Sequence, residues 1–571
     1  MGNFHRDNPD IDATLDALDL SEVAMLLEEG FRFAKDYDFA PKDVSDALDN
    51  YKRALDVCGD VMANRIAPLA DETDRVGSVL RDDGSVTYAP GIRLALDLFG
   101  RTGLLGVQIP YALGGLNMPC AILTACNDIV SRGDASLMNI FGLQGIAETI
   151  NMFGDEEMKK AYIPKLVTGE WTGAMVLTEP DAGSDLQSVR TIARQDADGC
   201  WRVTGVKRFI TNGCGDVLLV LARTEMDVSD GRGLSCLLVE KGPGVKVRRI
   251  EDKLGIHGSP TCELVFTNAP AKLVGQRKRG LITYVMALMN GARMGIAAQG
   301  TGIGEAAYRA ARDYAASRRQ FGRAIDEFPA IREILSTMSV ELQAARALTY
   351  YAAKSVDLET GLGRTGDRPR AKRYAAFNKM LTPMAKYYAS EMSMRNAMGA
   401  VAVLGGSGYM RDYPVERYLR DSRIATIYEG TSQLQVVAAV GGVTGGLTRD
   451  VVADVLEGVE LTDELKAACA EIGKLNDEID EAVRYVKGRA DAKAYHDLSA
   501  RRLVDAGIAV VVGALLVRLA AKLGAGKSAA LKGWLAMEFP KVRALLGQVK
   551  GGYDAILTDF EALAPAVEVL D

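Results

Sequence analysis

Histidine is scarce in this sequence, with 3 residues among 571. Zinc sites and Ser–His–Asp triads usually depend on histidine, so the sequence leaves little room for either. The 8 cysteines are scattered and none forms a C-x-x-C pair, so the usual signature of a zinc ribbon or a thioredoxin-like site is missing. We therefore expect no metal site. Scattered thiols also fit a reducing compartment better than a disulfide scaffold.

Long hydrophobic runs are missing as well. The N-terminal sequence MGNFHRDNPD is polar and lacks the apolar core of a secretory signal. The most apolar stretch, residues 506–516, contains two glycines and is followed by Arg518. It is shorter than the roughly 20 residues that cross a bilayer, so we interpret it as a buried helix. These features predict a soluble, cytoplasmic protein with no membrane span.

The chain has no excess of positive charge. Lys plus Arg is 68 and Asp plus Glu is 75, which gives a formal net charge of −7. An acidic balance argues against nucleic acid as a partner. With 48% hydrophobic and 25% charged residues, the composition is typical of a globular protein. A chain of this length is expected to contain about three or four packing units.

The spacing of apolar residues changes three times along the chain. Helical spacing is followed after about residue 172 by short apolar runs that indicate an antiparallel β barrel or sandwich. Helical spacing then returns, and a Gly-rich break at 441–446 precedes a last helical segment. We predict an α+β fold with four parts: an N-terminal helical domain (1–168), a middle antiparallel β domain (169–276), a C-terminal helical bundle (277–440) and an extra helical domain (447–571).

One candidate binding loop follows the first expected strand, in the sequence MVLTEPDAGSDLQSVR at 175–190. Gly183 permits close approach of the backbone, and Ser184 adds a hydroxyl beside free backbone N–H groups. Such a loop can hold a phosphate or the polar edge of a ring system. The alternative is a simple β-turn that closes the strand, and composition alone favours that turn.

A second candidate is RIATIYEGTSQ at 423–433. Glu429 follows several apolar residues. Desolvation in apolar surroundings raises the proton affinity of a carboxylate, which suits a general base. The alternative is a glutamate at a helix end, with Gly430 as the C-cap and a new helix beginning near Thr431.

A third candidate is YAASRRQFG at 314–322. Helical spacing places Tyr314 and Arg318 on one face, and Phe321 follows. An arginine beside an aromatic ring can clamp a diphosphate while the ring stacks, although a solvated basic helix end is the alternative. The glycines at 300, 302 and 304 resemble a dinucleotide fingerprint, but no strand precedes them, so we interpret them as sites of close helix packing.

The order and spacing of these motifs are more specific than any one of them. TEPDAGSD before a β domain, then KRFITN, RRQFG, LGGSGY, YPVER and IYEGTSQ, resembles the acyl-CoA dehydrogenases from about residue 99 to 437. The extra length is similar to the long-protein branch of that family, which includes methylthiopropanoyl-CoA dehydrogenases and some bacterial fatty acyl-CoA dehydrogenases. The resemblance implies a four-helix bundle as the C-terminal domain, with FAD between this bundle and the β domain.

The resemblance also implies a reaction, the α,β-dehydrogenation of an acyl-CoA thioester to a trans-2-enoyl-CoA. Glu429 is implied as the base that takes the α-proton, while the β-carbon gives a hydride to N5 of FAD. An electron-transferring flavoprotein is the implied acceptor, and a homodimer or homotetramer the implied assembly. An acyl-CoA oxidase and a non-catalytic flavoprotein scaffold are the alternatives, and the acyl group is not predicted.

Further site residues carry over position by position. The implied FAD-binding residues are Met175, Leu177, Thr178, Gly183, Ser184, Phe209, Thr211, Arg318, Phe321, Gly405, Gly406, Thr431 and Gln433. Among them, Arg318 and Phe321 are implied to hold the FAD of a neighbouring subunit. The implied substrate-binding residues are Ser184, Arg293, Tyr428 and Gly430.

The sequence also departs from the family pattern. Phe209 stands where many members have Trp, and Pro329 and Ala402 stand where Gln is usual. Positions 291 and 292 are Gly and Ala, which excludes the base position that some branches use on the earlier helix. His257 stands where Arg is common, and we expect it to be structural.

Overall fold

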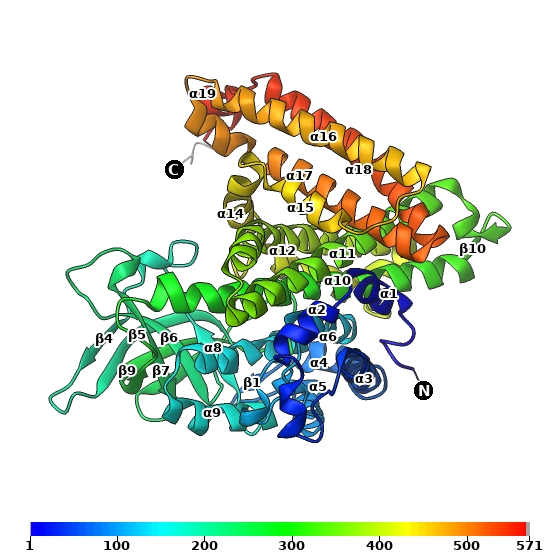
Figure 1. Ribbon diagram of the computed structural model, residues 1–571. Helices are drawn as coiled ribbons and strands as arrows, with labels where there is room; N and C mark the ends of the chain where they lie inside the picture. Colours follow the sequence, from blue (N-terminus) through cyan, green and yellow to red (C-terminus); the bar gives the residue numbers. More distant parts are fainter. Residues whose placement is uncertain (1, 567–571) are drawn as a thin grey trace.

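The computed structural model describes residues 2–566, and its elements follow the predicted order. Figure 1 shows the β domain at one side of the molecule, long helices across its middle and the extra helices on top. Helices at the N-terminus, a β domain, a helical bundle and extra C-terminal helices confirm the predicted fold class.

The N-terminal part is built from short helices. Aspartates begin several of them: the carboxylate of Asp155, for example, accepts a hydrogen bond from the backbone N–H of Met158. A small hairpin precedes α5 and consists of β1 (Val79–Leu80) and β2 (Val86–Thr87). The helices are α1 (Pro9–Leu18), α2 (Ser21–Leu27), α3 (Val44–Val61), α4 (Ala70–Val76), α5 (Pro90–Arg101), α6 (Cys120–Gly133), α7 (Ala135–Phe141), α8 (Gly145–Phe153) and α9 (Glu156–Thr168).

The middle part is a seven-stranded β domain. Its strands are β3 (Gly173–Val176), β4 (Ile192–Gln195), β5 (Trp201–Thr211), β6 (Val217–Arg223), β7 (Leu234–Glu240), β8 (Val245–Ile250) and β9 (Thr261–Leu273). Because β7 pairs with both β9 and β6, the sheet closes on itself as a barrel. Most pairings are antiparallel, as predicted, but β3 and β4 each pair with β6 in parallel. Apolar side chains from β5, β6, β7 and β9 fill the interior.

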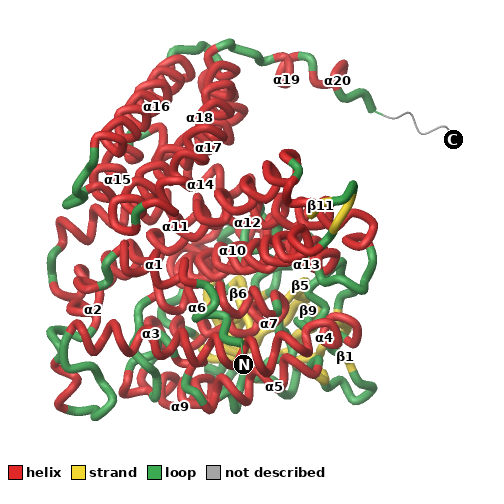
Figure 2. Tube along the Cα trace, turned by 90° about the vertical axis from the view of Figure 1, so that its right-hand side faces the viewer, coloured by secondary structure: helices red, strands yellow, loops and turns green. Residues whose placement is uncertain are grey.

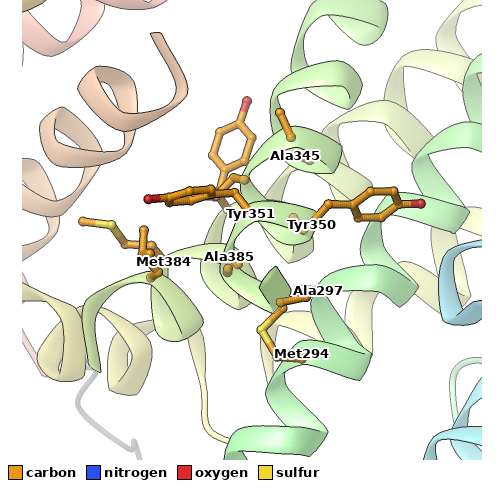
Figure 3. Packing of buried hydrophobic residues seen from close by; sticks show 14 of the residues in the cluster. Met294, Ala297, Ala345, Tyr350, Tyr351, Met384 and Ala385 are labelled. Carbon is orange, nitrogen blue, oxygen red and sulfur yellow. The ribbon is translucent and has the colours of Figure 1, made fainter. Parts of the chain in front are cut away.

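The bundle contains α10 (Met286–Ser317), α11 (Pro329–Thr365), α12 (Arg368–Leu404), α13 (Val415–Arg423) and α14 (Ser432–Thr444). Figure 3 shows the packing of three of these helices, with Met294 and Ala297 from α10, Tyr350 from α11, and Met384 and Ala385 from α12. The expected role of the glycines on α10 is also observed. A Cβ on Gly300 would lie 2.5 Å from the carbonyl oxygen of Ala389 on α12, so only glycine lets the two helices approach this closely.

The extra helices lie over α11 and α12 (Figure 1). They are α15 (Leu447–Leu456), α16 (Asp463–Lys487), α17 (Ala492–Leu523) and α18 (Ala525–Lys550), followed by the short α19 (Ala555–Thr558) and α20 (Phe560–Leu563). Figure 2 shows α19 and α20 leading away from the body of the molecule. The break before this part is shorter than predicted, because α14 continues through Gly441 and Gly442 and ends at Thr444.

In the part of the chain that the structure describes, two helical segments are long and apolar enough to cross a membrane, by length and composition only. They are 280–317 and 492–523, and the number is three if the bent pair α14–α15 counts as one. The apolar run at 506–516 therefore belongs to a 32-residue helix, and our argument from its short length was wrong. In α17, 89% of the apolar window is buried inside the protein, as the buried-helix interpretation expects. Trp534 of α18 contributes to this packing, and its indole N–H donates to the Ala509 carbonyl at 3.0 Å.

Candidate active site

Glu429 lies in a tight loop between the 3-10 turn η12 (Ile424–Thr426) and α14. Its φ of 53° and the φ of 87° at Gly430 place two successive residues in the left-handed region, which is unusual for a glutamate. Thr431 then caps α14, because its hydroxyl oxygen accepts the backbone N–H of Leu434 at 3.2 Å. The predicted restart of a helix at Thr431 is thus present, and the loop before it presents Glu429.

Two buried side chains fix this loop by donating hydrogen bonds to its backbone carbonyls. Nζ of Lys386, on α12, donates to the Gly430 carbonyl at 2.8 Å. Nε2 of Gln435, on α14, donates to the same carbonyl at 2.9 Å and to the Glu429 carbonyl at 3.2 Å. Sequence reasoning missed both residues. The signal for Lys386 was present, because it is a lone cation between Ala385 and Tyr387 of a buried helix.

The environment of Glu429 suits a base that works near neutral pH. Burial raises the pKa of Glu429 to about 7, and the positive charges of Lys386 and Arg293 oppose this rise. Burial also lowers the pKa of Lys386 to about 7, and the negative charge of Glu429 opposes that change. A carboxylate tuned in this way holds and releases a proton in the range where most enzymes operate.

Arg293 and Tyr428, both predicted to bind substrate, flank Glu429 differently. Arg293 lies on α10, where Nη1 donates to Oδ1 of Asn290 at 3.1 Å, while its buried Nε has no hydrogen-bond partner among the described residues. The Tyr428 hydroxyl lies within hydrogen-bond distance of two amide oxygens, Oδ1 of Asn139 at 3.0 Å and Oε1 of Gln299, and can donate to one of them at a time. The Tyr428 hydroxyl is therefore held by protein groups, whereas Arg293 keeps a free donor.

On the side of the β domain, the end of β3 is fixed to β5. Nζ of Lys207 donates to the Leu177 carbonyl at 2.7 Å and pairs with Oε1 of Glu179 at 2.9 Å. The Arg208 backbone N–H donates to the Thr178 carbonyl at 2.9 Å. Both charged side chains of the pair are buried, and burial lowers the pKa of Lys207 to about 8. This buried pair fixes the position of Leu177 and Thr178.

The loop after Thr178 is a turn, and it exposes Gly183 and Ser184. Glu179 and Ala182 exchange backbone hydrogen bonds of 2.9 and 3.2 Å, which is the β-turn that composition favoured. A Cβ on Gly183 would lie 3.8 Å from the Thr178 methyl group, so the loop folds back toward Thr178. The turn is therefore present, and it leaves Gly183 and Ser184 accessible, as a binding loop would require.

Phe209 is presented to solvent on the same side. It has a φ of 61° and lies at a bulge in β5 between Lys207 and Ile210, and 53% of its surface is exposed. The Arg208 guanidinium lies 4.6 Å from its ring centroid. Thr211, half-buried, ends the strand. An exposed aromatic ring in a strained conformation indicates a surface built to contact something outside the β domain.

The first turns of α10 connect the end of β3 to the Glu429 region. Leu177 and Met175 pack in one apolar cluster with Val285 and Met289. Arg293 follows Met289 by four residues, about 6 Å along the helix, and is close enough to Glu429 for their charges to interact. The end of β3 and the Glu429 loop therefore lie along the same short stretch of α10.

A second group of predicted residues lies at the other end of α10. Arg318 is extended rather than helical, because α10 ends at Ser317, so the expectation that Tyr314 and Arg318 share a helix face was wrong. Phe321 is at the tip of a hairpin, β10 (Arg319–Gln320) and β11 (Arg323–Ala324), with 93% of its surface exposed. Tyr314 ties this end to the loop of Gly405 and Gly406, through a hydrogen bond of 3.4 Å to Ser407.

The two groups are far apart within one chain. From Arg293 to Arg318 the helix advances 25 residues, about 37 Å. Figure 1 shows β10 and the β domain at opposite sides of the molecule. The structure thus places Met175, Leu177 and Thr178 along the same part of α10 as Arg293, Tyr428, Glu429, Gly430 and Thr431, and it separates Arg318, Phe321, Gly405 and Gly406 from them. Phe209 follows Arg208, whose backbone is hydrogen-bonded to Thr178.

Two remaining residues have simple surroundings. Gln433 is exposed on α14, and its Oε1 accepts Nη2 of Arg501 from the extra helices at 3.5 Å. His257 pairs with Asp74 at 2.8 Å and with the Lys253 carbonyl at 2.7 Å, which joins α4 to the β domain, in line with a structural role. Among residues 2–566, no cluster of His, Cys, Asp and Glu has the arrangement of a metal site.

Comparison with known proteins decides the family. Models of the acyl-CoA dehydrogenase N-terminal, middle and C-terminal domains match residues 49–170, 174–269 and 279–439. An acyl-CoA dehydrogenase of Bacillus subtilis is 40% identical over 344 residues, which is 59% of this chain and 86% of that protein. The chain belongs to the acyl-CoA dehydrogenase family. Flavin-dependent dehydrogenation of acyl-CoA thioesters is the chemistry of this family, so the resemblance inferred from the motifs is confirmed.

Other acyl-CoA dehydrogenases resemble the chain over more of its length. A 3-methylmercaptopropionyl-CoA dehydrogenase of Ruegeria pomeroyi is 34% identical over 426 residues, 69% of this chain and 70% of that protein. The crystal structure of Caenorhabditis elegans ACDH-11 has a TM-score of 0.76 at 20% identity and covers 93% of this chain and 94% of that chain. At this identity the likeness concerns the fold alone, and it extends into the helices after α14.

Proposed function

We propose that this acyl-CoA dehydrogenase binds FAD between its β domain and its bundle and converts an acyl-CoA thioester to a trans-2-enoyl-CoA, with Glu429 as the base. The observation that carries the proposal is the Glu429 loop. It presents a carboxylate whose pKa is raised to about 7 and which two cations, Lys386 and Arg293, face from α12 and α10.

The residues at the ends of β3 and β5, together with Arg293, fit a flavin. Phe209 offers an exposed aromatic face. Thr178 and Ser184 offer hydroxyls, and the backbone at Gly183 folds back toward Thr178. The buried Nε of Arg293 is a donor that no described protein group satisfies. Bound FAD would supply the acceptor for the hydride that leaves the substrate β-carbon.

The rest of the chemistry falls to the chain's own groups. The Cα–H bond breaks and its proton passes to a carboxylate oxygen of Glu429, while the electron pair becomes part of the new double bond. The backbone N–H of Glu429 is the proposed donor to the thioester carbonyl, where negative charge develops. The loop is already held by Lys386 and Gln435, so this donor needs no rearrangement during the reaction.

The second group of residues supports a homo-oligomer. Arg318 and Phe321 are exposed and lie about 37 Å along α10 from the Glu429 region, so we assign them to the FAD of a neighbouring subunit. A homodimer and a homotetramer would both supply this neighbouring subunit. Electron-transferring flavoprotein is the proposed acceptor of the electrons.

Glu429→Gln tests the role of the base. The amide keeps the shape of the side chain but cannot take the α-proton. We expect the purified variant to bind FAD and acyl-CoA yet to lose at least about a thousandfold in the rate of flavin reduction, at the upper part of the range for general base catalysis. The measurement is anaerobic stopped-flow absorbance, and Glu460→Gln, at an exposed site, is the matched control. A Glu429→Gln enzyme that reduces its flavin at the normal rate would refute the assignment.

A further inference from the structure

Lys386 is a buried cation that lies under the Glu429 loop and takes no direct part in the proposed reaction. Its side chain is 0% exposed on α12, and within residues 2–566 its ammonium group makes one hydrogen bond, the 2.8 Å contact to the Gly430 carbonyl. No ion pair within residues 2–566 includes Lys386. Burying an ammonium group is costly unless a nearby charge compensates for the loss of water. The nearby negative charges are those of Glu429 and, more weakly, Glu391.

We infer that Lys386 is a positioning residue for the base: it holds the Gly430 carbonyl and places a positive charge under Glu429 that favours the ionised carboxylate. This inference rests on the proposed role of Glu429. It assigns to Lys386 two separable effects, one through a hydrogen bond and one through charge.

The charges around Glu429 decide the direction of the effect. Lys386 faces it from α12 and Arg293 from α10, and both favour the carboxylate, while burial favours the protonated acid. Arg293 retains its charge at every working pH. Removing the charge at Lys386 removes one of the two interactions that stabilise the ionised carboxylate. The pKa of Glu429 therefore rises further, and the side chain takes up its proton at a higher pH.

Gln435 separates the two effects. Gln435 is fully buried on α14, and its neutral amide donates to the same Gly430 carbonyl at 2.9 Å. Gln435→Met removes a hydrogen bond from this carbonyl without changing any charge. Lys386→Met removes both a hydrogen bond and a charge, whereas Lys386→Gln removes the charge and keeps an N–H donor. Lys379→Met, at an exposed site of the same helix, is the control for removing a lysine from α12.

The experiment measures the pH dependence of flavin reduction by an acyl-CoA in each FAD-loaded variant. Lys386→Met and Lys386→Gln are expected to move the acid limb of the rate profile upward by about one pH unit, the lower end of the effect of a nearby opposite charge. Gln435→Met is expected to lower the rate without moving the limb, and Lys379→Met to change neither. If both charge-removing variants keep the wild-type limb, the charge effect is refuted. If only Lys386→Met fails to fold, Lys386→Gln decides the question.

A second readout keeps this result apart from the proposed function. Infrared difference spectroscopy follows the carboxylic acid band of Glu429 during a pH titration, and Glu429→Gln identifies the band. If no acyl-CoA reduces the wild-type flavin, the proposed function fails, while the infrared titration still reports on Lys386. The inference requires the band's midpoint to rise in Lys386→Met and Lys386→Gln, and an unchanged midpoint overturns it.

Discussion

At the scale of single residues, the site depends on one carboxylate in an unusual conformation. Glu429 has a positive φ, and the carbonyl that follows it accepts two buried donors, from Lys386 and Gln435. The cost of a left-handed glutamate, of the order of 1–3 kcal/mol, persists only where the surroundings fix it. The motif IYEGTSQ indicated the base from the sequence, but the two donors lie 43 residues before and 6 residues after Glu429, and only the fold brings them together.

The raised pKa of Glu429 predicts a pH dependence. A base must be deprotonated, and a carboxyl with a pKa of about 7 is mostly protonated below that pH. We expect the rate of flavin reduction to fall about tenfold for each pH unit well below 7 and to reach a plateau above it. Stopped-flow reduction across a pH series measures this, at saturating substrate so that binding does not contribute. A rate that stays constant down to pH values near the ordinary glutamate pKa, about 4.3, would contradict the account.

At the scale of elements, the buried pair Glu179–Lys207 locks the end of β3 to β5. Glu179 also accepts the backbone N–H groups of Arg190 at 2.7 Å and Thr191 at 2.9 Å, so one carboxylate connects three segments. These segments carry Thr178, Gly183 and Phe209, all proposed to contact FAD. The pair therefore supports the flavin site without belonging to it.

Lys207→Met tests this connection. Methionine fills similar space but leaves the Glu179 carboxylate buried without its cation, and breaking a buried pair in this way typically costs about 3–5 kcal/mol. We expect a loss of that size in the free energy of unfolding, measured by urea denaturation of the β domain signal, together with weaker FAD retention. Lys246→Met, at an exposed position of β8, is the control and should change stability by less than about 0.5 kcal/mol. An equal effect of both substitutions would contradict the role of the pair.

Elements differed in how well the sequence predicted them. The short apolar runs that predicted a β domain correspond to strands such as β6 and β7, because continuous apolar runs bounded by turn residues favour buried strands. Helix ends were less certain. Periodicity does not show where backbone hydrogen bonding stops, so Arg318 was placed in a helix that ends at Ser317, and α14 was ended too early at Gly441. The parallel pairing of β3 with β6 depends on contacts between distant segments, which no local pattern records.

At the scale of the whole molecule, α10 connects two regions with different roles. One end meets β3 and the Glu429 loop, and the other carries the hairpin of Arg318 and Phe321. The sequence motifs indicated both regions, and the resemblance assigned them to different subunits. Their separation along a 32-residue helix is consistent with that assignment, which stays a prediction. The domain boundaries after residues 168, 276 and 440 also stay predictions, as does the specific acyl group.

Phe321→Asp tests the proposed assembly. The side chain is exposed within one chain, so the substitution should leave the stability of the subunit within about 0.5 kcal/mol. A charge at a buried subunit contact, in contrast, should weaken the oligomer and its hold on FAD. Analytical ultracentrifugation and the flavin content per chain measure both effects. Met226→Asp, at an exposed site on the β domain, is the control. An intact oligomer with full flavin content in Phe321→Asp would contradict the proposal.

The most direct test of the whole account is an anaerobic titration of the purified, FAD-loaded protein with a panel of saturated acyl-CoA thioesters, followed through the visible absorbance of the flavin. The account predicts that at least one thioester bleaches the flavin with a stoichiometry of one per site, and that the product is the trans-2-enoyl-CoA. A protein that takes up no flavin, or a bound flavin that no acyl-CoA of any chain length or branching reduces, would contradict it.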